Sequence, residues 1–145
     1  MADIVRTKAQ IAVVFPSKAV IFSAVAGAAI EAGQPVYFDT TTKKVLLSDA
    51  NGSGTTKIHG IALEDAAAGA AVGILKEGHV YGYTVSGDVG SFAYVSDTVG
   101  ELADAAGTAV LPVGMVVPLT DVPTLTKVLY VDIPWTFRIV VDTIE

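Results

Sequence analysis

Residues 33–39 read Gly-Gln-Pro-Val-Tyr-Phe-Asp, and residues 90–96 read Gly-Ser-Phe-Ala-Tyr-Val-Ser. Each is followed by three segments in the same order, at offsets of 54 to 57 residues: 45–50, 58–63 and 71–75 in the first series, and 101–105, 112–117 and 127–131 in the second. We interpret the two series as an internal repeat over residues 33–75 and 90–131. An Ala/Val/Gly-rich chain also produces short matches by chance, but an ordered series of four is harder to explain in that way.

The segments of the repeat have the length and composition of β-strands. They are short, rich in β-branched and aromatic residues, and separated by Gly, Asn and Asp turns. Four strands are too few to bury one face, so we expect the two units to close on each other as a compact β-barrel or sandwich. Gly60 and Gly114 interrupt apolar runs and predict bulges or close backbone approach. Only residues 63–68 are compatible with a helical turn.

Both ends of the chain add strand signals. Residues 11–15 and 19–25 are apolar runs split by Pro16-Ser17-Lys18, which indicates two strands around a bend. Near the C-terminus, the apolar residues that share one parity predict a half-buried strand: Ile133, Trp135, Phe137, Ile139 and Val141. Pro134 cannot donate a hydrogen bond to a neighbouring strand, which indicates an edge position or a strand start there. The predicted fold class is therefore all-β, with one domain over residues 11–145 and a flexible or partner-ordered N-terminal arm over residues 1–10.

Composition excludes several functional classes. Of the 145 residues, 52% are hydrophobic and 17% charged, which is enough apolar material for a packed core. The net charge is −6 and no basic run is interleaved with aromatic residues, so we expect no nucleic-acid binding. No apolar run reaches the ~20 residues that a membrane span requires. Residues 19–29 superficially resemble a secretion signal, but we assign them to the fold.

Groups suited to catalysis are sparse. His59 and His79 each stand beside Gly in a strand-like run, where a surface ring is the expected role, and neither has a catalytic partner at a recognisable spacing. The acids Glu64, Asp65, Asp97 and Glu101 lie in or beside turns, where carboxylates are usually solvated. Residues 52–57 lack the spacing of a phosphate-binding loop, and there is no cysteine. We therefore expect no enzymatic activity, no cofactor and no metal site.

The first copy of the repeat also carries a family resemblance. Residues 32–39, 45–50 and 58–63, with the Ala-rich stretch 64–73, resemble small capsid-decoration (cement) proteins of tailed double-stranded-DNA bacteriophages. The likeness covers roughly residues 28–131 and is closer in the first copy. It implies a structural virion protein that binds the outer surface of the capsid, commonly as a trimer, and stabilises the shell against the pressure of the packaged DNA.

The resemblance implies the major capsid protein as the partner and the capsid exterior as the location, after synthesis in the host cytoplasm. It supplies no contact residues, so the candidate partner interface follows from composition and edge chemistry alone. The candidates are the N-terminal arm and the C-terminal edge, with Ile4, Val5, Arg6, Lys8, Ile133, Trp135 and Phe137. Trp135, the only tryptophan, suits a core or an interface position equally well.

Two other functions remain open at this point. A tail or baseplate β domain of a phage would have the same composition. A small β-fold enzyme or a carbohydrate-binding module is less consistent with the chain, because such modules usually present several exposed aromatic residues.

Overall fold

The computed structural model describes residues 3–52, 56–85, 87–119 and 127–134. Their strands are β1 (Val5–Arg6), β2 (Ala12–Val13), β3 (Val20–Val25), β4 (Pro35–Phe38), β5 (Val45–Leu47), β6 (Gly60–Ala62), β7 (Ala71–Tyr81), β8 (Tyr83–Thr84), β9 (Phe92–Val95), β10 (Leu102–Ala103), β11 (Pro112–Pro118) and β12 (Lys127–Asp132). Two 3-10 turns, η1 (Lys8–Gln10) and η2 (Pro16–Lys18), flank β2. The predicted all-β class is confirmed.

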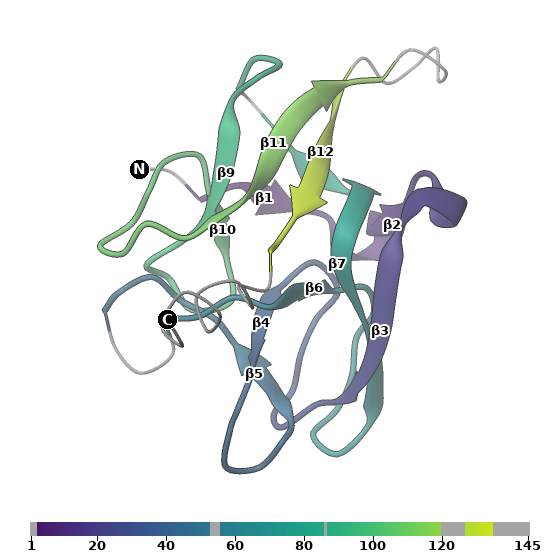
Figure 1. The fold of residues 1–145 in the computed structure, drawn as a ribbon, viewed down its shortest axis with the longest axis vertical. Coiled ribbons are helices and arrows are strands. Elements are labelled where there is room, and N and C mark those ends of the chain that lie inside the picture. The colour runs from purple at the N-terminus through teal and green to yellow at the C-terminus, as the bar shows by residue number, and fades with distance from the viewer. Residues whose placement is uncertain (1–2, 53–55, 86, 120–126, 135–145) are drawn as a thin grey trace, which may run out of the picture.

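A single antiparallel sheet contains most of these strands and curls into a half-barrel (Figure 1). Its strand order is β10-β9-β11-β12-β7-β6-β4-β5. The long strand β7 joins the two halves: β6 pairs with it through Leu75 and Ile74, and β12 pairs with it from Glu77 to Val80. Strands β2 and β3 also pair with β7, as expected for two strands around the bend at η2.

The two repeat segments fold into units with the same internal order. The first unit runs β5-β4-β6-β7 and the second β10-β9-β11-β12. The register also corresponds, because Val36 pairs with Gly60 in the first unit and Ala93 pairs with Gly114 in the second. Each pair joins the first and third strands of its unit.

The structure confirms the expected roles of the two strand glycines. A β-carbon on Gly60 would overlap the Ile74 side chain, and one on Gly114 would overlap the Tyr130 carbonyl oxygen. The register between β9 and β11 also shifts between Pro112 and Gly114, as at a β-bulge.

One expectation for the first unit is wrong. Residues 63–68 form no helical turn; instead Ala66 forms an antiparallel bridge with Ile30. Strand β7 also continues through Glu77-Gly78, although this pair has the composition of a turn. Gly78 permits this because it adopts φ 150° inside the strand, and any β-carbon there would press against Ala19.

Buried side chains form two apolar clusters. The larger cluster lies between the two units and draws on both of them, including Ile61, Leu75, Leu129 and Val131. The smaller cluster lies on the other face of the first unit: Ala26, Ile30, Val36, Val45, Ala62, Ala66, Val72 and Ile74. The first unit is therefore packed on both faces.

Candidate partner-binding surfaces

Residues 3–10 lie along the edge of the second unit. Strand β1 pairs with β8, and the Ile4 amide donates to the Leu102 carbonyl at 2.8 Å. The Thr7 amide donates to the Gly82 carbonyl at 2.8 Å, and the Ile4 side chain belongs to the larger core cluster. In this conformation the segment is held by both backbone bonds and apolar burial.

Arg6 anchors this segment through charge. Its side chain is only 11% exposed, and its two Nη atoms bind Glu101 Oε2 at 2.6 Å and Glu31 Oε1 at 2.9 Å. Its Nε donates to the Ala32 carbonyl at 3.2 Å. Burial alone would lower the pKa of Arg6, but the hydrogen bonds and charges of Glu101 and Glu31 outweigh burial and raise it. One guanidinium thus connects the N-terminal segment, the first unit and the second unit.

Lys8 extends the charge cluster towards solvent. Its Nζ lies 2.9 Å from Glu31 Oε2 and 3.7 Å from Asp65 Oδ2, and its side chain is about half exposed. The hydrogen bond and charge of Lys8, with those of Arg6, lower the pKa of Glu31. A cleft of about 400 Å³ lies over the cluster, lined by Asp3, Ile4, Val5, Arg6, Lys8, Glu31 and Glu101.

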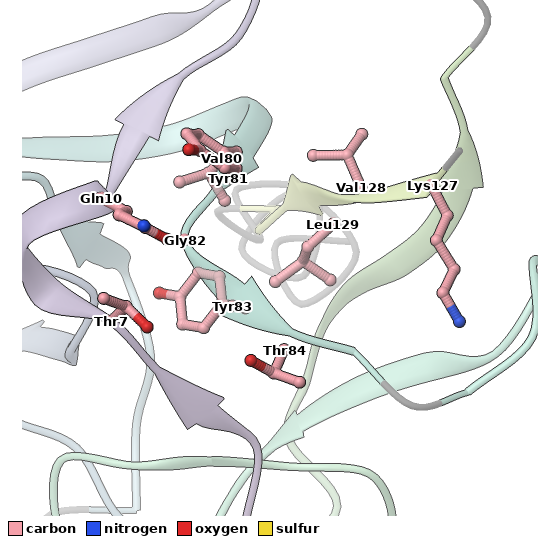
Figure 2. Close-up of a pocket in the computed structure, with 10 residues that line it drawn as sticks. All are labelled: Thr7, Gln10, Val80, Tyr81, Gly82, Tyr83, Thr84, Lys127, Val128 and Leu129. Atoms are coloured by element: carbon pink, nitrogen blue, oxygen red, sulfur yellow. The ribbon is translucent and has the colours of Figure 1, made fainter. Parts of the chain in front are cut away.

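A second, smaller pocket of about 110 Å³ lies beneath the segment (Figure 2). Thr7 and Gln10 face the β7–β8 turn across it, and Lys127, Val128 and Leu129 of β12 complete the lining. The Tyr83 hydroxyl donates to the Gly33 carbonyl at 2.6 Å, and burial raises the pKa of Tyr83. The pocket is far below the ~300–1,000 Å³ of small-molecule sites, so it does not suit a metabolite.

At the other predicted surface, Ile133 is 1% exposed and belongs to the larger core cluster. Its amide donates to the Lys76 carbonyl at 3.1 Å. The strand predicted beyond Pro134, including Trp135 and Phe137, lies outside the described residues. Next to Pro134 is an apolar groove of about 380 Å³, lined by Phe92, Pro112, Gly114, Met115, Tyr130, Asp132 and Pro134.

The candidate interface residues therefore occupy different environments. Ile4, Arg6 and Ile133 are committed to contacts within the chain, whereas Val5 is 65% exposed and Lys8 is exposed. Val5 and Lys8 lie on one segment, and both line the cleft over the charge cluster. Their role in binding a partner stays a prediction.

The two histidines are less exposed than expected from the sequence. The His59 ring stacks on Phe38 at 5.0 Å, and its Nδ1 accepts a hydrogen bond from the Phe38 amide. The His79 ring lies between Phe15 and Tyr130, with centroid distances of 5.1 and 4.9 Å. Burial, with a smaller contribution from a nearby lysine, lowers the pKa of both rings. Both histidines therefore pack against aromatic rings.

The carboxylates in or beside turns make structural contacts. Asp65 accepts a hydrogen bond from the Ala32 amide, and Glu64 accepts one from the Gly73 amide. Asp97 accepts hydrogen bonds from both the amide and the hydroxyl of Thr108. Among the described residues, no group of three His, Cys, Asp or Glu side chains could hold a metal ion. Within the same ranges, no helix has the length and apolar character needed to cross a membrane.

Sequence reasoning missed two features of these surfaces. It did not pair Arg6 with Glu31 and Glu101, because those contacts span 25 and 95 residues. It also did not find the groove at Phe92, because only the register places Phe92, Met115 and Tyr130 side by side. The alternation within β11 and β12 was visible in the sequence, but the alignment of these strands with each other was not.

Strand β3 is a further exposed apolar element, with Val20, Ile21 and Val25 at 47%, 47% and 39% exposure.

A comparison of the sequence with known protein families bears on the function of the chain. Residues 9–77, just under half of the chain, match a family described as phage cement protein. The match extends from η1 through β2 to β6 and ends within β7, so it contains nearly all of the first unit. Searches of curated proteins and of solved structures gave no match. The predicted resemblance is thus confirmed over residues 9–77, which match the phage cement proteins, a family of structural phage proteins.

Proposed function

We propose that this protein binds the outer surface of the mature capsid of a tailed phage and stabilises the shell against the pressure of its DNA. The observation that carries the proposal is the cement-family match over residues 9–77. Its partner is the major capsid protein, and it acts as a homo-oligomer, a trimer. Synthesis takes place in the host cytoplasm, and the protein needs no catalytic residue for this role.

The mechanism is thermodynamic linkage. A protein that binds only the expanded shell stabilises that state, by an amount that grows with its free concentration relative to its Kd. A trimer that contacts neighbouring capsid subunits at once gains further affinity, because the second and third contacts are intramolecular. The packed β core supports this role, because a flexible protein would lose conformational entropy on binding and would therefore bind more weakly.

The N-terminal segment is the part of the shell contact that the described structure supports best. Val5 projects an exposed apolar side chain, and Lys8 presents a cation beside it. Arg6 fixes the segment between the two units, so both side chains are held on a rigid base. Pre-organisation of this kind lowers the entropic cost of binding.

The test uses purified virions stripped of this protein and then supplied with purified full-length chain. We expect stripped particles to lose DNA at a lower temperature, and added protein to restore heat resistance. If stripped virions withstand heating equally well, the capsid-stabilising role is wrong. Immunogold labelling that places the protein on the tail or baseplate would instead support the alternative virion location.

Matched variants test the contact surface. The double variant Val5→Asp with Lys8→Gln should bind stripped capsids more weakly than wild type. The control is Val110→Asp with Lys44→Gln, which makes the same chemical changes at an exposed valine and an exposed lysine elsewhere in the chain. Equal capsid binding by both double variants would exclude the N-terminal segment as the contact.

A further inference from the structure

Strand β3 forms an edge of the sheet, on the side of β7 that faces away from β6 and β12 (Figure 1). Over residues 21–24, no strand of the described ranges pairs with its outer side. Just past the end of β3, the Gly27 amide donates to the Val45 carbonyl at 2.8 Å, so β5 closes the edge there. The open edge therefore comprises residues 21–24.

The backbone groups of the open edge alternate in direction. The Ala26 amide donates to the Ala70 carbonyl at 2.9 Å, on the β7 side of the strand. Because N–H and C=O groups alternate between the two sides of an antiparallel strand, those of Phe22 and Ala24 also face β7. Those of the residues between them point away from the sheet.

The pairing partner of Ser23 leads to the same conclusion. Ser23 pairs with Gly73 of β7, and the Gly73 carbonyl accepts a hydrogen bond from the Leu63 amide on the opposite side of β7. Ser23 and Gly73 are thus a pair that exchanges no hydrogen bonds with each other. The N–H and C=O groups of Ile21 and Ser23 are therefore open to a further strand.

The side chains of β3 also form two rows. Phe22 and Ala24 pack against the smaller core cluster. Ile21, Ser23 and Val25 alternate with them and are exposed. The apolar run that superficially resembles a secretion signal thus forms one packed row and one exposed row.

This edge lacks the devices that usually prevent strand addition. Natural edge strands carry a charge, a proline or a bulge that discourages pairing. Strand β3 contains no charged residue and no proline, and its register shift lies between its first residue and Ile21. Residues 21–24 are therefore a regular edge to which an extended chain can add. They also lie within residues 9–77, the part that matches the cement family.

Charge indicates which kind of strand fits the edge. The chain has a net charge of −6, but residues 4–30 contain three cations and no carboxylate. One of them, Lys18, lies two residues before β3 and is exposed. Among the described residues it forms no salt bridge. A strand with a carboxylate near the Lys18 end is therefore electrostatically complementary to the edge.

A second copy of the chain is less suitable as the occupant. Antiparallel pairing of two β3 strands about Ser23 would bring the η2 turn of each copy, with Lys18, against the start of β5 in the other. That part of β5 follows Lys43 and Lys44, so like charges would meet at both ends. The net charge of −6 on each copy opposes the association further.

We propose that β3 receives a strand of the major capsid protein. An extended segment of that protein, apolar at alternate positions and with a carboxylate near the Lys18 end, adds to the sheet at Ile21 and Ser23. The inference rests on the proposed capsid binding and adds a contact to that of the N-terminal segment. Two contacts on one chain strengthen binding, because the second forms at a high effective concentration.

The variant Ser23→Pro tests the edge directly. The Ser23 amide faces away from β7, so proline removes an outward donor and obstructs an added strand while the pairing with β7 remains. We expect binding to stripped capsids to weaken by about tenfold or more, because the hydrogen bonds and the packing of the added strand are lost together. Ser23→Thr retains the amide and is the matched control. Equal capsid binding by the two folded variants would overturn the proposal.

Hydrogen exchange in the wild-type chain needs no variant. The protein is exchanged while bound to stripped capsids, released, and analysed by NMR. We expect the Ile21 and Ser23 amides to exchange at least ~10-fold more slowly on the capsid than in the free protein, because they gain hydrogen bonds. The Phe22 and Ala24 amides, which face β7, should be slow in both states. Unchanged exchange at Ile21 and Ser23 would overturn the proposal.

The same measurement separates the other outcomes. Slow exchange at Ile21 and Ser23 in concentrated protein without capsids would assign the edge to a second copy and overturn the proposal. Restored heat resistance with an unprotected edge would overturn strand addition and leave capsid stabilisation intact. A protected edge on capsids that gain no heat resistance would support strand addition and contradict stabilisation.

Discussion

At the residue scale, Gly114 occupies a position where backbone contact leaves no room for a side chain. Its pairing partner on β12 is Val131, and the carbonyl oxygen of the preceding residue, Tyr130, fills the space of a β-carbon. Gly60 meets a comparable restriction from Ile74 at the equivalent position of the first unit. The two glycines therefore allow the third strand of each unit to approach the fourth closely.

Gly114→Ala should destabilise the protein by about 2 kcal/mol or more, because the strand has to move away from β12. The measurement is urea unfolding followed by circular dichroism. Gly73→Ala is the matched control, since Gly73 also lies in a strand and its nearest obstacle is Glu64 Oε1 at 3.9 Å. Equal stability of the two variants would contradict the close approach at Gly114.

His79 should make stability depend on pH. Burial, with the charge of Lys18, lowers the pKa of the ring in the folded chain, so the unfolded chain binds the proton more readily. The stability that the neutral ring contributes is complete above the unfolded pKa of about 6.5 and is lost as the pH falls below it. His79→Phe retains a ring between Phe15 and Tyr130 and should flatten the decline in stability towards pH 5. An unchanged pH profile of the unfolding midpoint would show that His79 is not responsible.

At the scale of elements, the N-terminal segment depends on Arg6. Arg6→Met should cost about 1 to 2 kcal/mol, because two carboxylates lose a charged hydrogen-bond partner although solvent compensates in part. Lys8→Met is the control, and a largely exposed ion pair should contribute little. Hydrogen exchange at the Ile4 and Thr7 amides should accelerate only in the Arg6 variant. Unchanged exchange at these amides would show that the backbone bonds hold the segment alone.

The sequence predicted most strands because local chemistry determines them. Alternation and β-branched residues marked β4, β9 and β12, and Pro16 marked the bend before β3. The errors arose where tertiary pairing overrode a local signal. Glu77-Gly78 has the composition of a turn, but three partner strands hold β7 extended through it. The Ala-rich residues 63–68 favour a helix, but Ala66 pairs with Ile30 instead.

The candidate surfaces were less predictable for the same reason. Exposure of Val5 and burial of Ile4 follow from period-2 alternation once the segment is known to be extended. The pairing of Arg6 with Glu101, and the alignment of Phe92 with Met115, depend on which strands become neighbours. A single sequence carries no local signal for that choice.

At the scale of the whole molecule, β7 makes the two units interdependent. Its first half pairs with the first unit and its second half with the second, and the larger cluster fills the space between them. Leu75 and Val80 of β7 share that cluster with Leu129 and Val131 of β12. We therefore expect a single cooperative unfolding transition for the full chain.

A fragment comprising residues 1–85 should fail to fold, although it contains the whole family-matched segment. Without the second unit, Ile61, Leu75 and Val80 lose their apolar partners and become exposed. The measurement is the dispersion of amide resonances in an NMR spectrum, compared with the full chain under the same conditions. A dispersed spectrum with cooperative unfolding would show that the first unit is independent.

The strand order of the sheet is the same when it is followed from either edge. Each half begins with the second strand of its unit at the edge, continues with the first and third strands, and ends with the fourth strand at the centre. The last strands of the two units, β7 and β12, meet antiparallel at the centre. Two identical half-length chains that paired through their last strands across a twofold axis would give the same order. The sheet thus has the form of a symmetric dimer whose two chains are joined into one, which is the arrangement that a tandem duplication of a half-length gene would produce.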